Sequence, residues 1–170
     1  MGPTANRLNA VIGQPQKRFL GLAIALFIAD LITKQWMLSL VFEPPRVIEI
    51  TPFFNLVPVW NSGVSFGLLA EYAYLVGFAI PLIALGVVIW LWRQLPLLGA
   101  AGQYAAGFIA GGAAGNVLDR LRFGKVVDFL DFHLYGYHWP AFNLADISIF
   151  LGVALWLYEA FISTRNKAPR

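Results

Sequence analysis

Cysteine is absent from this 170-residue sequence. The absence excludes disulfide bonds, thiolate metal sites, a cysteine nucleophile and lipidation of a cysteine in this chain. Histidine is scarce as well, since His133 and His138 are the only two and no HExxH pattern occurs. A zinc peptidase of that type is therefore not expected, and the sequence predicts no metal site.

Charged residues are also few. They make up 12% of the chain, and 59% of its residues are hydrophobic, whereas soluble domains have about 25% and 45–50%. The excess of apolar residues indicates contact with lipid. The net charge of +3 is not gathered into one block, so no nucleic-acid partner is expected, and basic flanks of membrane helices explain the charge better.

Four apolar stretches are each close to the roughly 20 residues that a helix needs to cross hydrocarbon. They cover residues 19–41, 73–92, 97–118 and 142–162. The first is too long for the core of a cleaved signal peptide and carries Asp30 and Lys34, so we expect a retained helix. The sequence thus predicts a single all-α membrane domain over 1–170, with four transmembrane helices after a cytoplasmic tail, 1–18.

Basic residues predict the orientation, because cytoplasmic flanks are enriched in Lys and Arg. With both termini inside, seven basic residues lie on the inner side and four on the outer side. The inner group is Arg7, Lys17, Arg18, Arg93, Arg165, Lys167 and Arg170, and the outer group is Arg46, Arg120, Arg122 and Lys125. We therefore expect a multi-pass protein whose two termini are cytoplasmic.

Two outer segments, 43–72 and 120–141, connect the helices. The first contains β-rich runs at 47–51 and 54–60 that are broken by prolines, which indicates a small sheet on the membrane surface. The second is rich in aromatic residues, which favour the membrane interface.

Gly107, Gly111 and Gly115 recur every four residues in the third apolar stretch. Small residues with this spacing let another helix approach closely. We expect the stripe to pack within the bundle of a monomer. A dimer interface is the alternative.

Ionisable side chains within a membrane are costly, so each is a functional candidate. Asp30 and Lys34 share one face of the first helix and can form an ion pair that fixes this helix in the bundle. Asn116, Asp119 and Arg120 share a face at the outer end of the third helix.

Asn143 and Asp146 share the first turn of the fourth helix, and Asp128 lies between the two helices among apolar neighbours. All these groups fall at one depth, the outer edge of the bundle. Two carboxylates in close contact cannot both ionise easily, so one keeps a proton. The ionised acid can then activate water while the protonated one polarises a carbonyl, which is the chemistry of an aspartic peptidase.

Simpler roles are open to three of these polar residues. Asn143 can be a helix N-cap. Asp119 can form a salt bridge with Arg120 or Arg122. We interpret Asp131 as a solvated loop charge.

At these residues the sequence resembles the lipoprotein signal peptidases, also called signal peptidase II. The resemblance covers nearly the whole chain after residue 16, and five short motifs carry it in order. They are Asp30-Leu-Ile-Thr33-Lys34, Asn61-Ser-Gly63-Val-Ser-Phe66, Gly111-Gly112-Ala-Ala-Gly115-Asn116-Val-Leu-Asp119-Arg120, Val126-Val127-Asp128-Phe129 and Phe142-Asn143-Leu-Ala145-Asp146.

The resemblance implies an aspartic endopeptidase of the bacterial cytoplasmic membrane, without metal or cofactor, whose active site faces the outer, periplasmic side. It implies cleavage of prolipoproteins on the amino side of a diacylglyceryl-modified Cys, contact with membrane lipids, and inhibition by cyclic peptides such as globomycin. The catalytic acids map onto Asp128 and Asp146. The substrate-binding or supporting positions are Asp30, Lys34, Asn61, Gly63, Asn116, Asp119, Arg120 and Asn143.

Two alternatives stay open at this stage. Gly63-Val64-Ser65-Phe66-Gly67 matches the G-x-S-x-G motif of serine hydrolases, although the alternating strands and helices that form that elbow are missing. Buried acids also suit a proton-coupled carrier, for which Glu159 is the one acid near the inner end of the fourth helix.

Overall fold

Four long helices and a small sheet make up the described part of this computed structural model, residues 13–63 and 73–167. The helices are α2 (Gln14–Val41), α3 (Ala73–Gln94), α4 (Ala100–Phe123) and α5 (Leu144–Lys167), with a 3-10 turn, η2 (Leu95–Leu97), between α3 and α4. The strands are β1 (Ile48–Thr51), β2 (Phe54–Asn61), β3 (Val126–Leu134) and β4 (Tyr137–His138). The predictions for residues 1–12 and for Ser65 lie outside the described residues.

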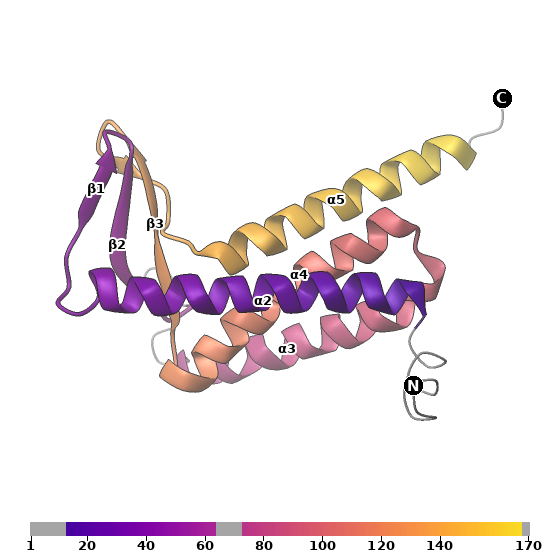
Figure 1. The fold of residues 1–170 in the computed structure, drawn as a ribbon, viewed down its shortest axis with the longest axis horizontal. Helices are drawn as coiled ribbons and strands as arrows, with labels where there is room; N and C mark the ends of the chain where they lie inside the picture. The colour runs from indigo at the N-terminus through magenta and orange to yellow at the C-terminus, as the bar shows by residue number, and fades with distance from the viewer. Residues whose placement is uncertain (1–12, 64–72, 168–170) are drawn as a thin grey trace, which may run out of the picture.

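The sheet stands at one end of the helices (Figure 1). Helix α4 is central, since it packs against α2, α3 and α5. Helix α5 begins beside β3, and its far end diverges from the other helices (Figure 1). Because α2 ends and α5 begins next to the sheet, polar residues at these helix ends can meet β3.

Three helical segments are long and apolar enough to cross a membrane, namely Gln14–Val41, Ala79–Leu97 and Leu144–Ile162. Large apolar side chains on them are exposed, including Ile32 on α2 and Leu157 on α5. The chain is therefore a multi-pass membrane protein. Helix α4 is not among the three because Gly and Ala lower its hydropathy, as the sequence of 97–118 indicates, and its own span stays a prediction.

The glycine stripe of α4 packs against α2, which confirms the prediction of packing within the bundle. A Cβ on Gly111 would lie 2.7 Å from the carbonyl oxygen of Ala23, and a Cβ on Gly107 would lie 3.0 Å from that of Phe19. Contacts this close to backbone atoms leave room only for glycine.

Helix α5 approaches another face of α4 in the same way. A Cβ on Gly152 would lie 2.8 Å from the carbonyl oxygen of Ala105, and a Cβ on Gly112 would meet the carbonyl oxygen of Ala145. Glycines of α4, together with Gly152 of α5, therefore bring both α2 and α5 close to α4.

The sheet is antiparallel, with the strand order β1-β2-β3-β4. Strands β1 and β2 coincide with the two predicted β-rich runs, whereas β3 forms within 120–141, where the sequence predicted only an aromatic surface segment. Met37 and Val41 of α2 pack with Val127 and Phe129 of β3 in one buried cluster. This cluster seats β3 on the C-terminal end of α2.

A bulge in β2 determines which residues flank Asp128. The pairing of β2 with β3 is interrupted just before Val59, next to Pro58, which has no N–H to donate. Pairing resumes with Val59 opposite Asp128 and Asn61 opposite Val126. The side chain of Asn61 is thereby held near Asp128.

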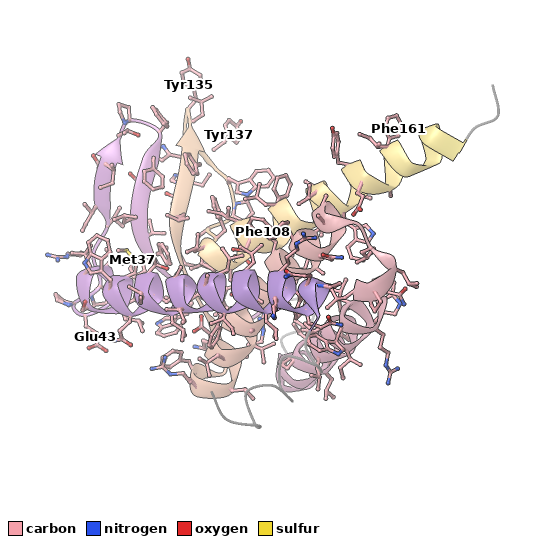
Figure 2. The ribbon with its side chains drawn as sticks, turned by 45° about the vertical axis from the view of Figure 1, so that its right-hand side comes forward. Met37, Glu43, Phe108, Tyr135, Tyr137 and Phe161 are labelled. Atoms are coloured by element: carbon pink, nitrogen blue, oxygen red, sulfur yellow. The ribbon has the colours of Figure 1, made fainter. Side chains whose placement is uncertain are left out.

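Aromatic side chains crowd the far tip of the sheet. Tyr135 and Tyr137 project there, away from the helices (Figure 2), and are 92% and 83% exposed. Exposed aromatic residues are typical of a membrane interface, and this location for 120–141 stays a prediction.

We predict that Gly111→Ala lowers the stability of the bundle. Its new methyl group would collide with the backbone of α2, and overpacking of this kind costs about 1–3 kcal/mol. Gly86→Ala on α3 is the matched control, because a Cβ there meets nothing within 4 Å and alanine favours a helix. Thermal unfolding in detergent would measure both, and equal melting temperatures would contradict the close packing of α2 on α4.

Candidate active site

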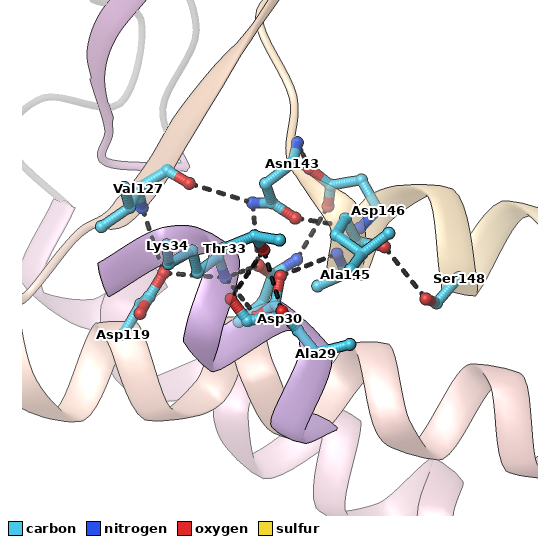
Figure 3. Close-up of polar contacts among 12 residues, drawn as sticks. Ala29, Asp30, Thr33, Lys34, Asp119, Val127, Asn143, Ala145, Asp146 and Ser148 are labelled. Carbon is cyan, nitrogen blue, oxygen red and sulfur yellow. Dashed lines mark hydrogen bonds and ion pairs between the residues drawn. The ribbon is translucent and has the colours of Figure 1, made fainter. Parts of the chain in front are cut away.

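Two carboxylates from different elements meet at Asn143. Asp128 lies on β3, and Asp146 lies in the first turn of α5. Asn143 Nδ2 donates a hydrogen bond to Asp128 Oδ1 at 2.7 Å. Asn143 Oδ1 accepts the backbone N–H of Asp146 at 3.0 Å. The backbone N–H of Asn143 donates to Asp146 Oδ2 at 3.1 Å (Figure 3).

The N-cap role that the sequence suggested for Asn143 is therefore also correct. The reciprocal bonds between Asn143 and Asp146 form a capping box at the start of α5. The requirements of helix capping thus place Asp146 beside the amide that holds Asp128.

A second amide, that of Asn116 on α4, has its orientation fixed by Lys34. The ammonium group of Lys34 donates to Asn116 Oδ1 at 2.9 Å. An ammonium has no acceptor, so the oxygen of this amide must face it. Asn116 Nδ2 then points the other way and donates to Asp146 Oδ1 at 2.7 Å.

Lys34 is the buried cation of an ion triad. Its Nζ lies 2.8 Å from Asp30 Oδ2 and 2.8 Å from Asp119 Oδ2, and the side chains of all three residues are 3% exposed or less. The pairing of Asp30 with Lys34 confirms the prediction from their spacing. The suggested pairing of Asp119 with Arg120 or Arg122 is wrong, because Asp119 lies on the face of α4 that meets α2.

Each acid of the triad also accepts a backbone N–H from a neighbouring element (Figure 3). Asp30 accepts that of Ala145 at 2.9 Å, and Asp119 accepts that of Val127 at 3.1 Å. The triad therefore fixes the residues adjacent to Asp146 and Asp128 in the chain. No pattern in the sequence predicted these backbone partners.

Asn61 at the end of β2 donates to the other oxygen of Asp128, with 2.8 Å between Asn61 Nδ2 and Asp128 Oδ2. Its own oxygen accepts the N–H of Gly63 at 2.7 Å. Gly63 has a φ of 76°, in the left-handed region that glycine adopts without strain. The turn at Gly63 thereby orients the amide of Asn61 toward Asp128.

Burial raises the pKa of Asp128 to about 6, because its carboxylate is removed from water. The hydrogen bond from Asn61 opposes this rise, the negative charge of Asp146 adds to it, and the hydrogen bond from Asn143 opposes it. An acid with a pKa near 6 can exchange a proton at the pH at which most enzymes work.

Arg120 follows Asp119 on α4 and is half-buried beside the two acids. Its Nη1 donates to the backbone carbonyl of Asn116 at 3.2 Å. The structure therefore brings all ten sequence-predicted site residues around one cluster. They are Asp30, Lys34, Asn61, Gly63, Asn116, Asp119, Arg120, Asp128, Asn143 and Asp146.

The interpretation of Asp131 as a solvated charge is wrong. Asp131 is 5% exposed, because it lies within β3 between two polar neighbours. Asn55 Nδ2 donates to its Oδ2 at 3.1 Å, and His138 Nδ1 lies 2.9 Å from its Oδ1. The ring of His133 stacks on that of His138, so this second polar cluster belongs to the sheet and is separate from the two acids.

Among residues 13–63 and 73–167, no group of three or more His, Cys, Asp and Glu side chains is placed to hold a metal ion. The hydrogen-bonding groups around Asp128 and Asp146 are the amides of Asn61, Asn116 and Asn143. These neutral donors hold the two carboxylates in place without adding a charge to the site.

Comparison with known proteins gives a consistent result. Residues 22–162 match the family described as Signal peptidase (SPase) II. A lipoprotein signal peptidase of Syntrophotalea carbinolica is 43% identical over 84% of this chain and 90% of its own length. That of Aeromonas hydrophila is 44% identical over 88% and 92%.

Comparison with solved structures gives the same result as comparison of sequences. A bacterial membrane enzyme determined at 2.3 Å superposes with a TM-score of 0.72 at 28% identity, covering 89% of this chain and 92% of that one. A second, determined at 1.9 Å, gives 0.69 at 27% identity over 88% and 94%. On the strength of the fold, the cluster around Asp128 and these matches, this chain belongs to the signal peptidase II family of membrane peptidases.

Proposed function

We propose that this protein removes the signal peptide from bacterial prolipoproteins by hydrolysing the bond on the amino side of a diacylglyceryl-modified Cys, with Asp128 and Asp146 as its catalytic pair. One observation carries the proposal: two acids from separate elements are held by the same residue, Asn143, whose side-chain amide donates to Asp128 and whose backbone N–H donates to Asp146. The names of the curated relatives support the substrate class.

The pair begins the reaction with one proton shared between the two acids. The ionised acid takes a proton from a water molecule, whose oxygen then attacks the scissile carbonyl carbon. The protonated acid donates its proton to the carbonyl oxygen as negative charge develops there. When the tetrahedral intermediate collapses, the carbon–nitrogen bond breaks and a proton passes to the leaving amine. The proton belongs to the pair and is not assigned to either residue.

The three amides hold this pair without competing for its proton. Those of Asn61 and Asn143 donate to Asp128, and that of Asn116 donates to Asp146. An amide does not titrate in this range, so it can orient a carboxylate at any working pH. Each carboxylate is held in place, which lowers the cost of reaching the transition state.

We further propose that α4 is a fourth transmembrane helix, which with α2, α3 and α5 gives a single membrane domain over 1–170 with both termini inside. The basic residues of the sequence support this orientation. The sheet end, with Asp128 and Asp146, then faces the periplasmic side of the bacterial cytoplasmic membrane. A diacylated substrate would present its bond at that level, because its acyl chains stay in the bilayer.

The remaining expectations belong to this proposal. The protein acts as a monomer in contact with membrane lipids, needs no metal or cofactor, and is inhibited by globomycin-type cyclic peptides. The serine alternative depends on Ser65, outside the described residues, and the carrier alternative depends on Glu159. The next experiment discriminates among the three.

We predict that Asp128→Asn and Asp146→Asn each lower the cleavage rate by about 10²–10⁴-fold or more, because each removes a proton-transfer group. Both variants should insert and purify normally. A gel-shift assay with purified protein and a diacylglyceryl-modified prolipoprotein would measure the loss.

Asp131→Asn is the matched control, since it replaces a buried acid on the same strand and should leave the rate nearly unchanged. EDTA should have no effect. Full activity of either catalytic variant, or loss of the cleavage step in a folded Ser65→Ala variant, would sink the aspartic mechanism. Transport of protons by vesicles whose protein cleaves nothing would favour the carrier.

We also predict that kcat/KM falls as pH rises through about 6, the pKa of Asp128. Above that pH the pair has lost its shared proton, and none remains for the carbonyl oxygen. Asn61→Ala removes a hydrogen bond that favours the ionised form, so it should raise this pKa and move the falling limb to higher pH, besides slowing the reaction.

Asn55→Ala is the matched control for this shift. It removes an equivalent amide bond between β2 and β3, the one to Asp131, and should leave the pH profile in place. Initial rates measured in detergent over a range of substrate concentrations give kcat/KM at each pH for wild type, Asn61→Ala and Asn55→Ala. A limb that does not move in Asn61→Ala would show that the limb does not report the proton shared by Asp128 and Asp146.

A further inference from the structure

An apolar groove runs along a face of α4 that the polar cluster does not use. It has a volume of about 340 Å³ and lies where α2, α3 and α4 meet. The hollow exists because α4 contributes the small residues Ala110, Ala113 and Ala114, while Leu85 of α3 and Phe27 of α2 form its walls. Ala114 is exposed, so the groove is open along its side to surrounding lipid.

The groove has the length of one lipid leaflet. Its lining on α4 extends from Ala110 to Leu121, which is about 16 Å at the rise of an α-helix. The hydrocarbon of a bilayer is about 30 Å thick, so one leaflet, and hence one acyl chain, spans about 15 Å. The groove occupies the half of α4 nearer the sheet, which the proposed orientation places in the outer leaflet.

One end of the groove borders the buried core, and the other end lies at the depth of the site. At the core end, Ala110 and Val88 belong to or pack on a buried cluster with Leu91. At the other end, Val117 and Leu121 line the groove, and they follow the site residues Asn116 and Arg120 in the chain. The groove therefore begins on another face of α4, at the depth of the residues that surround the catalytic pair.

We propose that this groove receives one acyl chain of the diacylglyceryl group on the substrate's modified Cys. The inference rests on the proposed function, in which that Cys adjoins the bond cleaved by Asp128 and Asp146. Its thioether-linked chains leave the site within a few bonds of the catalytic pair and must enter the bilayer. The groove offers an apolar path from that level to the middle of the membrane.

The groove orients the substrate more than it binds it. The surrounding lipid is as apolar as the alanine and leucine lining, so transfer of a chain from lipid to groove gains packing and no dehydration. A seated chain fixes the position of its Cys relative to the two acids. The buried core at Val88 also limits the length of acyl chain that the groove can hold.

The test fills the groove and varies the acyl chain. Purified wild type and Ala114→Leu would cleave two forms of one prolipoprotein, carrying either dipalmitoyl or dibutyryl glyceryl on its Cys. We expect wild type to prefer the long-chain form. Ala114→Leu should lower kcat/KM for that form about fivefold, which is about 1 kcal/mol, and leave the short-chain form nearly unchanged.

Ala154→Leu is the matched control, because Ala154 is an exposed alanine on α5 outside the groove, and it should behave as wild type. An unchanged chain preference in folded Ala114→Leu would overturn the groove and leave the proposed function intact. Failure of wild type to cleave either form would instead overturn the proposed function.

A second measurement locates the chain directly and does not depend on the Ala114 variant. Asp128→Asn would bind a substrate with a photoactivatable diazirine at mid-chain, and mass spectrometry would map the labelled residues. Labels concentrated on Ala114, Val117 and Leu85 would support the proposal. Labels spread equally to the exposed Leu157 of α5, or displaced from the groove by an ordinary phospholipid, would show general lipid contact and overturn it.

Discussion

The ammonium group of Lys34 is the constraint on which the site depends. It lies almost wholly inside the protein and pairs with Asp30 and Asp119, one on α2 and one on α4. Removing one partner from a buried pair leaves an uncompensated charge and costs about 3–5 kcal/mol, so the three side chains must stay together. Because Lys34 can only donate, it also decides which way the amide of Asn116 points. A structural ion triad thereby determines the geometry around Asp146.

The acids of the outer cluster fall into two classes by their partners. Asp30 and Asp119 have a cation, whereas Asp128 and Asp146 receive hydrogen bonds from neutral amides. Burial raises the pKa of Asp128 from 3.8 to about 6, against the opposing hydrogen bonds from Asn61 and Asn143. A raised carboxyl pKa contributes stability below about pH 4, and that contribution is lost as pH rises through 6, at a cost of about 3 kcal/mol in all. The fold therefore gives up stability at neutral pH to keep a proton available at the site.

The sequence predicted which helix faces carry polar groups or close packing, and it missed the contacts that depend on β3. The spacing of Asp30 and Lys34 and the glycine stripe of α4 were read correctly, because helical periodicity is local. The burial of Asp131 and the strand β3 were missed, because aromatic residues in 120–141 suit a membrane surface and a strand equally well. Asn143 was predicted as a cap, but its bond to Asp128 arises only once β3 lies on α2. Strand pairing and register are long-range properties that no single stretch of sequence encodes.

Helix α4 is the least hydrophobic of the long helices for the same reason that it is central. Glycine at 107, 111, 112 and 115 lets α2 and α5 approach, and this approach carries Asp30 and the N–H of Ala145 into contact. Alanine at 110, 113 and 114 instead leaves space on the face toward α3. Both faces are built from residues that contribute little hydropathy, so α4 is a poor transmembrane helix by composition. Its composition reflects what it must accommodate: two closely packed helices on one side and, on the other, a space open to lipid.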